Sequence, residues 1–224
     1  NHQLARLKFF VRAGSESAAG YKYEASNWVE RKSTDGQDKT LGMQVTKITL
    51  KDMVNVVDMD LAATTSARNG ASTAPFVVCS KDVDNKNKLD PDKGLITPVV
   101  PKYPYGHENI PAEGDPDAKG TQVGEPVMFF PNGNISLSID LKQYVEDTKD
   151  ETDGDKITYK EVEKLDTPLI IDQSKISKDV KEFKAGTSYN VYITIYGFEK
   201  IEVTAVLTAW EDGGDIETDI EDGK

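Results

Sequence analysis

The chain has very few of the residues on which most catalytic and metal sites depend. Its 224 residues include one cysteine and two histidines, so no internal disulfide can form. No run of 18 apolar residues occurs, and we therefore expect no membrane-spanning helix. The formal net charge of −12 argues against binding to nucleic acid or to anionic lipid, both of which need a basic surface.

The histidines and the cysteine lie where a catalytic role is not expected. His2 stands at the start of the chain, and His107 lies in a proline-rich stretch, so neither imidazole is predicted to be held in a triad. Cys79 ends the apolar run 76–79, where a thiol is usually inert packing. With no glycine-rich phosphate loop and too few zinc ligands, the sequence predicts no catalytic residue, no cofactor and no metal site, and hence not an enzyme.

Two acidic loops are the candidate calcium sites. Both are rich in carboxylate and amide oxygens, but Lys86 falls where the third acidic ligand of an EF-hand loop belongs, so we interpret them as solvated loops. They comprise Asp82, Asp84, Asn85, Asn87, Asp90 and Asp92 in the first loop, and Asp147, Asp150, Asp153 and Asp155 in the second. A carboxylate pair for glycoside hydrolysis stays open, since acids are plentiful and nothing singles out a pair.

The clearest structural signal is a β-hairpin over 188–208. Tyr189, Val191, Ile193 and Ile195 form one apolar row, and the alternation resumes at Ile201 after a break that contains glycine. Alternate side chains of a strand point to opposite faces, so both strands are expected to bury one face. A hairpin alone is not stable in water, and the rest of the chain must supply the sheet that it joins.

The remaining chain predicts further short strands, about nine or ten in total, separated by turn signals. A phase shift between Val45 and Ile48 indicates a bulge, and Asn132-Gly133 indicates a tight turn. The loop 13–42 is expected to hold one short strand, and 174–183 one helical turn. The other expected strands are 4–12, 43–50, 53–61, 76–79, 94–100, 126–130, 135–141, 157–162 and 169–171.

This pattern predicts an all-β fold, an antiparallel β-sandwich or barrel. We expect a single module over 1–224. Within it, 80–125 is a long loop insertion rich in proline and aspartate, and 211–224 is an acidic tail. Because the sequence begins at Asn1 without a methionine, we also expect a processed start.

Aromatic side chains outside the expected strands are the candidate ligand-binding residues. They could form a sugar-stacking surface, although such residues more often cap a core. They are Tyr21, Tyr23, Trp28, Tyr103, Tyr105 and Tyr144.

Both ends of the chain resemble fimbrillin-like proteins. The segment Ala185-Gly186-Thr187-Ser188-Tyr189 and the strand after it resemble that family's aromatic-rich strand, which follows an Ala-Gly-x-x-Tyr start, and Trp210 resembles its closing tryptophan. His2-Gln3-Leu4-Ala5-Arg6 resembles the family's His-x-Leu-Ala-Arg/Lys entry, and 43–61 is similar to its early strands. The middle, from 62 to 168, carries no such resemblance.

The resemblance implies an antiparallel β-sandwich with a transthyretin-like or Ig-like Greek-key arrangement. It also implies subunits of type V pili of Gram-negative bacteria, exported as lipoproteins and polymerised by donor-strand exchange with other pilus subunits. Family members usually carry two modules, and the motif at His2 normally begins the second. The chain is therefore similar to a C-terminal module or to a short relative. The lipidated cysteine and the protease-processed strand belong to the part before Asn1, so Arg6, Arg12, Arg31 and Arg68 receive no role as a cleavage site.

The sequence thus favours a structural or adhesive cell-surface protein, a fimbrillin-like subunit or accessory protein that assembles by strand addition. Its partners would be other pilus subunits, with host or bacterial surface ligands as further candidates, and its location the outer-membrane surface. The alternative is a surface glycan-binding β-sandwich module, and a secreted hydrolase with a carboxylate pair is the third hypothesis. Strand addition would be refuted if both sheet edges were covered by the protein's own strands.

Overall fold

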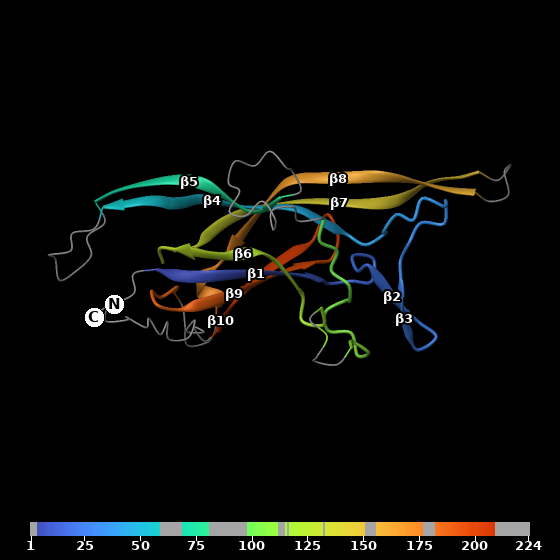
Figure 1. The fold of residues 1–224 in the computed structure, drawn as a ribbon, viewed down its shortest axis with the longest axis horizontal. Helices are drawn as coiled ribbons and strands as arrows, with labels where there is room; N and C mark the ends of the chain where they lie inside the picture. The colour runs from blue at the N-terminus through green and yellow to red at the C-terminus, as the bar shows by residue number, and fades with distance from the viewer. Residues whose placement is uncertain are drawn as a thin grey trace, which may run out of the picture.

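Two four-stranded sheets lie face to face in the computed structural model, which describes residues 4–58, 69–80, 98–111, 115, 117–131, 133–150, 156–176 and 182–208 (Figure 1). The first sheet has the order β10-β9-β1-β6 and the second the order β5-β4-β7-β8. The predicted all-β sandwich is therefore confirmed. The bounds in the first sheet are β1 Ala5–Ala13, β6 Thr121–Phe129, β9 Ser188–Ile195 and β10 Ile201–Thr208; those in the second are β4 Gln44–Asp58, β5 Asn69–Ser80, β7 Ile135–Asp150 and β8 Lys156–Ile171.

The core lies between the sheets and follows from the period-2 alternation of the strands. In β1, each residue from Ala5 to Ala13 alternates between fully buried and half-buried, and Leu7, Phe9 and Val11 face the second sheet. Burying one such side chain contributes roughly 1.5–3 kcal/mol. The buried partners from the other central strands are Ile48 and Leu50 of β4, Leu137, Ile139 and Leu141 of β7, and Tyr189, Val191, Ile193 and Ile195 of β9.

The chain crosses repeatedly from one sheet to the other, as in Greek-key sandwiches. It passes between the sheets from β1 to β4, from β5 to β6, from β6 to β7 and from β8 to β9. Neighbouring strands run antiparallel with one exception, because β1 and β9 are parallel, with Leu7 opposite Tyr189 and Val11 opposite Ile193. The C-terminal hairpin is thereby joined to the sheet along the first strand of the chain.

Several expected strands prove to be parts of longer ones. The segments 43–50 and 53–61 were separate in the prediction, but they belong to the single strand β4, which bends at Asp52, where φ is 50°. The segments 157–162 and 169–171 likewise join in β8, which carries a second such residue, Asp166. In both cases the strand stays paired with a neighbour across the irregularity, so a local turn signal does not end it.

Other expectations are confirmed in part. The bulge near Val45 is present, since the register of β4 on β7 shifts between Val45 and Lys47. A short 3-10 turn, η1, covers Gln173–Lys175. Of the expected strand 94–100, residues 94–97 lie outside the described residues, and 98–100 contribute a bridge between Val99 and Val45. The segment 121–125, placed in the insertion, belongs to β6.

Two hairpins extend beyond the sandwich at opposite ends (Figure 1). At one end β4 and β5 continue past Leu50, the last residue of β4 that pairs with β7. At the other end β7 and β8 pair out to Asp150 and Lys156. This second ribbon is fastened to the loop after β3 by Gln143, whose Nε2 donates to the Leu41 carbonyl at 2.8 Å.

The Ala-Gly-x-x-Tyr segment forms a turn that fixes the start of β9. Gly186 has a φ of 71°, and its N–H donates to the Leu4 carbonyl at 2.8 Å, while the Arg6 N–H donates to the Thr187 carbonyl at 2.9 Å. The hydroxyl of fully buried Tyr189 accepts the Lys184 N–H at 2.8 Å and lies 2.9 Å from Thr187 Oγ1. The turn is thus tied both to β1 and to the core.

Candidate functional site

The four edge strands of the two sheets differ in how well they are protected against pairing with another chain. Proteins usually blunt an exposed edge with proline, bulges or charge. β5 contains Pro75 and several register shifts, β6 contains Pro126 and a bulge at Gly124, and β8 contains Pro168 and the irregularity at Asp166. These three edges are therefore poor templates for an added strand.

β10 has none of these protections. All eight of its residues pair with β9 in continuous register, and the strand contains no proline and a single charged residue, Glu202. Val206 and Leu207 are 45% and 43% exposed. None of the described strands pairs with β10 on its outer side. Among the described residues, no strand of the protein itself therefore covers the β10 edge. Strand addition would have been refuted if the protein's own strands had covered it.

The charge on β10 is confined to the end nearest the hairpin turn. Glu202 accepts a hydrogen bond from Tyr196 at 3.1 Å and lies 3.2 Å from Lys200 Nζ. The hydrogen bond from Lys200, which is the larger cause, and the one from Tyr196 lower the pKa of Glu202 below its ordinary value. Glu202 therefore stays ionised at neutral pH. From Val203 to Thr208 the edge is uncharged.

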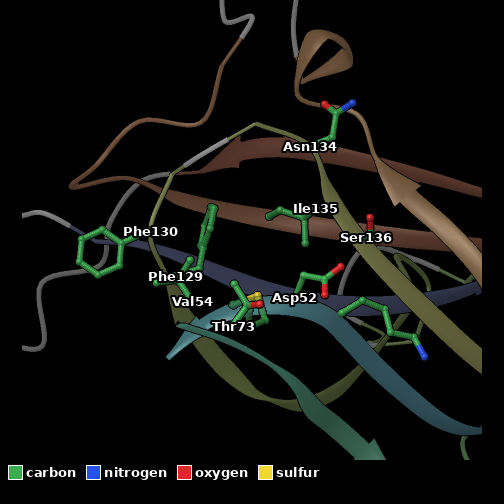
Figure 2. Close-up of a pocket in the computed structure, with 10 residues that line it drawn as sticks. Asp52, Val54, Thr73, Phe129, Phe130, Asn134, Ile135 and Ser136 are labelled. Atoms are coloured by element: carbon green, nitrogen blue, oxygen red, sulfur yellow. The ribbon is translucent and has the colours of Figure 1, made fainter. Parts of the chain in front are cut away.

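A cleft of about 330 Å³ opens at the other side of the sandwich, where β4 leaves β7 (Figure 2). Figure 2 shows Phe129 and Ile135 on one wall, with Val54, Thr73 and Asp52 on the opposite one. The remaining lining residues are Lys51, Met53, Phe130, Asn134 and Ser136. The hollow is lined by polar and apolar side chains alike, and the lysine in that lining, Lys51, is engaged with Asp166 at 2.7 Å.

Four of the six candidate aromatics do come together, in a small cluster beside the sandwich. They lie on the hairpin of β2 (Tyr21–Glu24) and β3 (Asn27–Glu30) and on the segment 98–111. The loop 13–42, which was expected to hold one short strand, therefore holds two. Trp28 contacts Tyr23, Tyr103 and His107 with ring centroids 5.0–5.2 Å apart, and the Tyr23 ring lies 5.4 Å from that of His107. Its Nε1 donates to the Asn109 carbonyl at 2.7 Å. Tyr21 joins through Tyr103.

The cluster packs one segment of the chain on another, and each of its tyrosines and Trp28 is half-buried. The other two candidates lie elsewhere. Tyr105 is 54% exposed and covers Arg12, while Tyr144 lies on the ribbon of β7 and β8, 5.4 Å from Lys39 Nζ. The six residues therefore do not form one continuous sugar-stacking row.

The other candidate residues show no catalytic arrangement in the described ranges. His107 accepts the Asn109 N–H at 3.1 Å within the aromatic cluster. Cys79 is buried, and burial raises the pKa of its thiol to about 12. No group of three or more His, Cys, Asp or Glu that could hold a metal is found among the described residues.

Most of the candidate calcium ligands lie outside the described residues, as do His2, Arg68 and Trp210. Asp147 is described, and its carboxylate pairs with Lys160 at 2.7 Å. Of the unassigned arginines, Arg31 donates to the carbonyls of four residues and so holds the loop before β2 in place; these are Glu16, Ser17, Ala19 and Leu41. Burial lowers its pKa.

Sequence reasoning missed two features: the cleft and the contact of Arg12 with aromatic rings. The cleft arises where β4 diverges from β7, and a local sequence pattern does not predict where two paired strands separate. Arg12 and Tyr192 do lie on outward positions of the two predicted strands, but pairing them requires the parallel register of β1 on β9.

Comparisons with known proteins give only a coarse result. The chain matches no family model and no curated protein. Among solved structures it is similar to a "putative cell adhesion protein" from Bacteroides uniformis, with a TM-score of 0.42 and 12% identity over 93% of this chain. The chain spans about half the length of that protein, 51%. The described part of the chain has no helix with the length and hydropathy needed to cross a bilayer.

Proposed function

We propose that this chain is a non-enzymatic structural or adhesive protein of the bacterial cell surface, similar to fimbrillin-like subunits, which associates with other subunits by adding a strand at β10. One observation carries the proposal. β10 is the sheet edge without proline or bulge, and its outer side presents an uncharged stretch with exposed Val206 and Leu207.

Strand addition at β10 has a simple physical basis. An added strand would pair with the backbone N–H and C=O groups on the outer side of β10 and would cover its exposed apolar side chains. A contact of eight residues is small, so we expect association in the range of about micromolar to millimolar.

The test is the self-association of the purified chain and of two lysine variants, measured by sedimentation at increasing concentration. Val206→Lys places a charge on β10 at a position that is already 45% exposed, so the fold is expected to tolerate it. Ile170→Lys is the matched control on the edge strand β8, where the side chain is 59% exposed.

We expect the unmodified chain and Ile170→Lys to associate alike, and Val206→Lys to associate at least about tenfold more weakly, because a lysine on an otherwise uncharged edge strand opposes pairing with another strand. A chain that stays monomeric up to about 1 mM, above the range expected for a small interface, contradicts the proposal. So does an equal effect of both variants.

A second candidate function, a glycan-binding module, has one observation in its favour. Tyr105 offers an exposed aromatic ring on the outer face of the first sheet, outside the self-packed cluster. The same ring covers the guanidinium of Arg12.

A further inference from the structure

The outer face of the first sheet carries an arginine held between two aromatic rings. The Arg12 guanidinium carbon lies 3.5 Å from the centroid of the Tyr192 ring and 4.1 Å from that of the Tyr105 ring. Tyr192 is in turn stacked on Phe10 at 5.2 Å. Three separate segments, β1, β9 and the loop 98–111, therefore meet at this one side chain.

The surrounding backbone fixes the position of Arg12. Its Nε donates to the Lys119 carbonyl at 2.8 Å. Gly120 has a φ of 117°, and a Cβ there would lie 2.8 Å from Arg12 Cγ, so the loop can approach this closely only with glycine. Tyr105 is anchored by its own N–H, which donates to the Ala13 carbonyl at 2.7 Å.

The guanidinium keeps donors that the protein itself does not use. Of its five N–H groups, the one on Nε is bonded, and the structure shows no acceptor for the Nη atoms among the described residues. Neither Nη atom is among the buried atoms without a partner, so solvent reaches them. No described carboxylate lies within ion-pair distance of Arg12, although the chain carries a net charge of −12.

The charge of Arg12 is thus balanced by ring faces rather than by an acid. Ring faces favour a cation without occupying its N–H donors, whereas a carboxylate would occupy them. The planar fork of an arginine matches a carboxylate through two parallel hydrogen bonds. The guanidinium covers one face of the Tyr105 ring, and the exposed remainder of that ring offers an apolar surface against which a sugar ring can lie.

We infer that Arg12, Tyr105 and Tyr192 form a binding site for an acidic saccharide, with the sugar carboxylate on the Nη atoms of Arg12 and the pyranose ring against Tyr105. Because Arg12 is held before the ligand arrives, little side-chain freedom is lost on binding. The site lies on the outer face of the sheet and not at the edge of β10, so it goes beyond strand addition and does not depend on it.

The experiment is a titration of the isotope-labelled full chain, followed by NMR, with two pairs of probes. Trigalacturonate is compared with its methyl ester, and 3′-sialyllactose with lactose, so that each pair differs in a carboxylate or in the acidic sugar that bears it. We expect at least one acidic probe to shift the signals of Arg12 Nε and of the Tyr105 backbone amide, and its neutral counterpart to bind at least about tenfold more weakly.

Variants separate a binding site from a merely structural stack. Arg12→Gln and Tyr105→Ala are each expected to weaken the acidic probe about tenfold or more, and Arg12→Lys to weaken it as well, because lysine lacks the fork. Lys200→Gln is the matched control, since Lys200 also lies over a tyrosine ring of the first sheet, 4.1 Å from the Tyr196 centroid. It should bind as the unmodified chain does.

The inference is overturned if neither acidic probe shifts these signals, if acidic and neutral probes bind equally, or if Lys200→Gln weakens binding as much as Arg12→Gln. Spectra of each variant, recorded without ligand, show whether its fold is retained, and Arg12→Lys provides the answer if Arg12→Gln does not fold. Val206→Lys should bind the saccharide as the unmodified chain does. The Arg12 and Tyr105 variants thus test the saccharide site, and Val206→Lys tests strand addition separately.

Discussion

Replacing Tyr189 with phenylalanine removes one oxygen atom from the centre of the turn that begins β9. The side chain is fully buried, and its ring contacts Phe183 edge to face at 4.9 Å. The hydroxyl accepts the Lys184 N–H at 2.8 Å and lies 2.9 Å from Thr187 Oγ1. Phenylalanine keeps the ring packing and leaves these two polar groups without that partner.

The expected cost is about 0.5–1.5 kcal/mol, the net contribution of an ordinary hydrogen bond, because the Lys184 N–H and the Thr187 hydroxyl are only partly buried. For a chain of this size each kcal/mol shifts the melting temperature by about 2–4 °C, so we expect a decrease of roughly 1–6 °C. Tyr196→Phe is the matched control on the same strand region, because the Tyr196 hydroxyl meets Glu202 at the surface. It should change the free energy of unfolding by less than about 0.5 kcal/mol.

Equilibrium unfolding in urea, followed by tyrosine and tryptophan fluorescence, measures both variants. The reasoning fails if Tyr189→Phe unfolds at the same urea concentration as the unmodified chain. It also fails if the two phenylalanine variants lose the same stability, since the Tyr189 hydroxyl would then not differ from one in contact with water.

Three further predictions concern the core and the surface loops. Gly124→Ala should cost about 2–4 kcal/mol, because φ is 67° and the new Cβ would clash with the Val78 carbonyl oxygen. Gly36→Ala, with a φ of 77° and open space around it, should cost clearly less in the same urea assay. Asp35 has its pKa lowered to about 2, chiefly by the hydrogen bond from Ser33. The ionised Asp35 therefore contributes its full stabilisation above the unfolded pKa of 3.8, and this contribution is lost as pH falls towards 2. Asp35→Asn should flatten that part of a plot of the free energy of unfolding against pH. An unchanged plot contradicts the assignment. Cys79, with a thiol pKa of about 12 and a buried side chain, should resist iodoacetamide at pH 8 in the folded chain and react once urea unfolds it, and rapid alkylation of the folded chain would show that the site is open.

The parts of the fold that sequence predicts are those with an unbroken period of two. β1, β9 and β10 each lie close to their expected bounds, and β1 and β9 bury the expected row of side chains. In β10 only Ala205 of that row is buried, because the strand lies at the edge of the sheet, and Leu207 is exposed. The ends of β4 and β8 were harder to predict, because Asp52 and Asp166 resemble turn residues. Both adopt positive φ inside strands that pairing with a neighbour carries onward.

The candidate sites were less predictable, because they depend on contacts between distant segments. The sequence of β10 shows that the strand has no proline and only one charged residue. Its position at the edge of the sheet depends on the order of all the strands and cannot be predicted from that segment alone. The aromatic cluster needed the approach of 98–111 to the β2–β3 hairpin. The Arg12 stack needed the parallel pairing of β1 with β9, which a sequence pattern does not specify.

Hydrogen–deuterium exchange of the β10 amides, compared between dilute and concentrated chain, tests the central claim most directly. The N–H groups of 201–208 that do not face β9 should exchange quickly in dilute solution, and they should become protected as the concentration rises and a strand pairs with that edge. Slowing confined to these alternate residues is the predicted result. Unchanged exchange along β10, or protection that appears instead on β5, β6 or β8, would contradict strand addition at this edge.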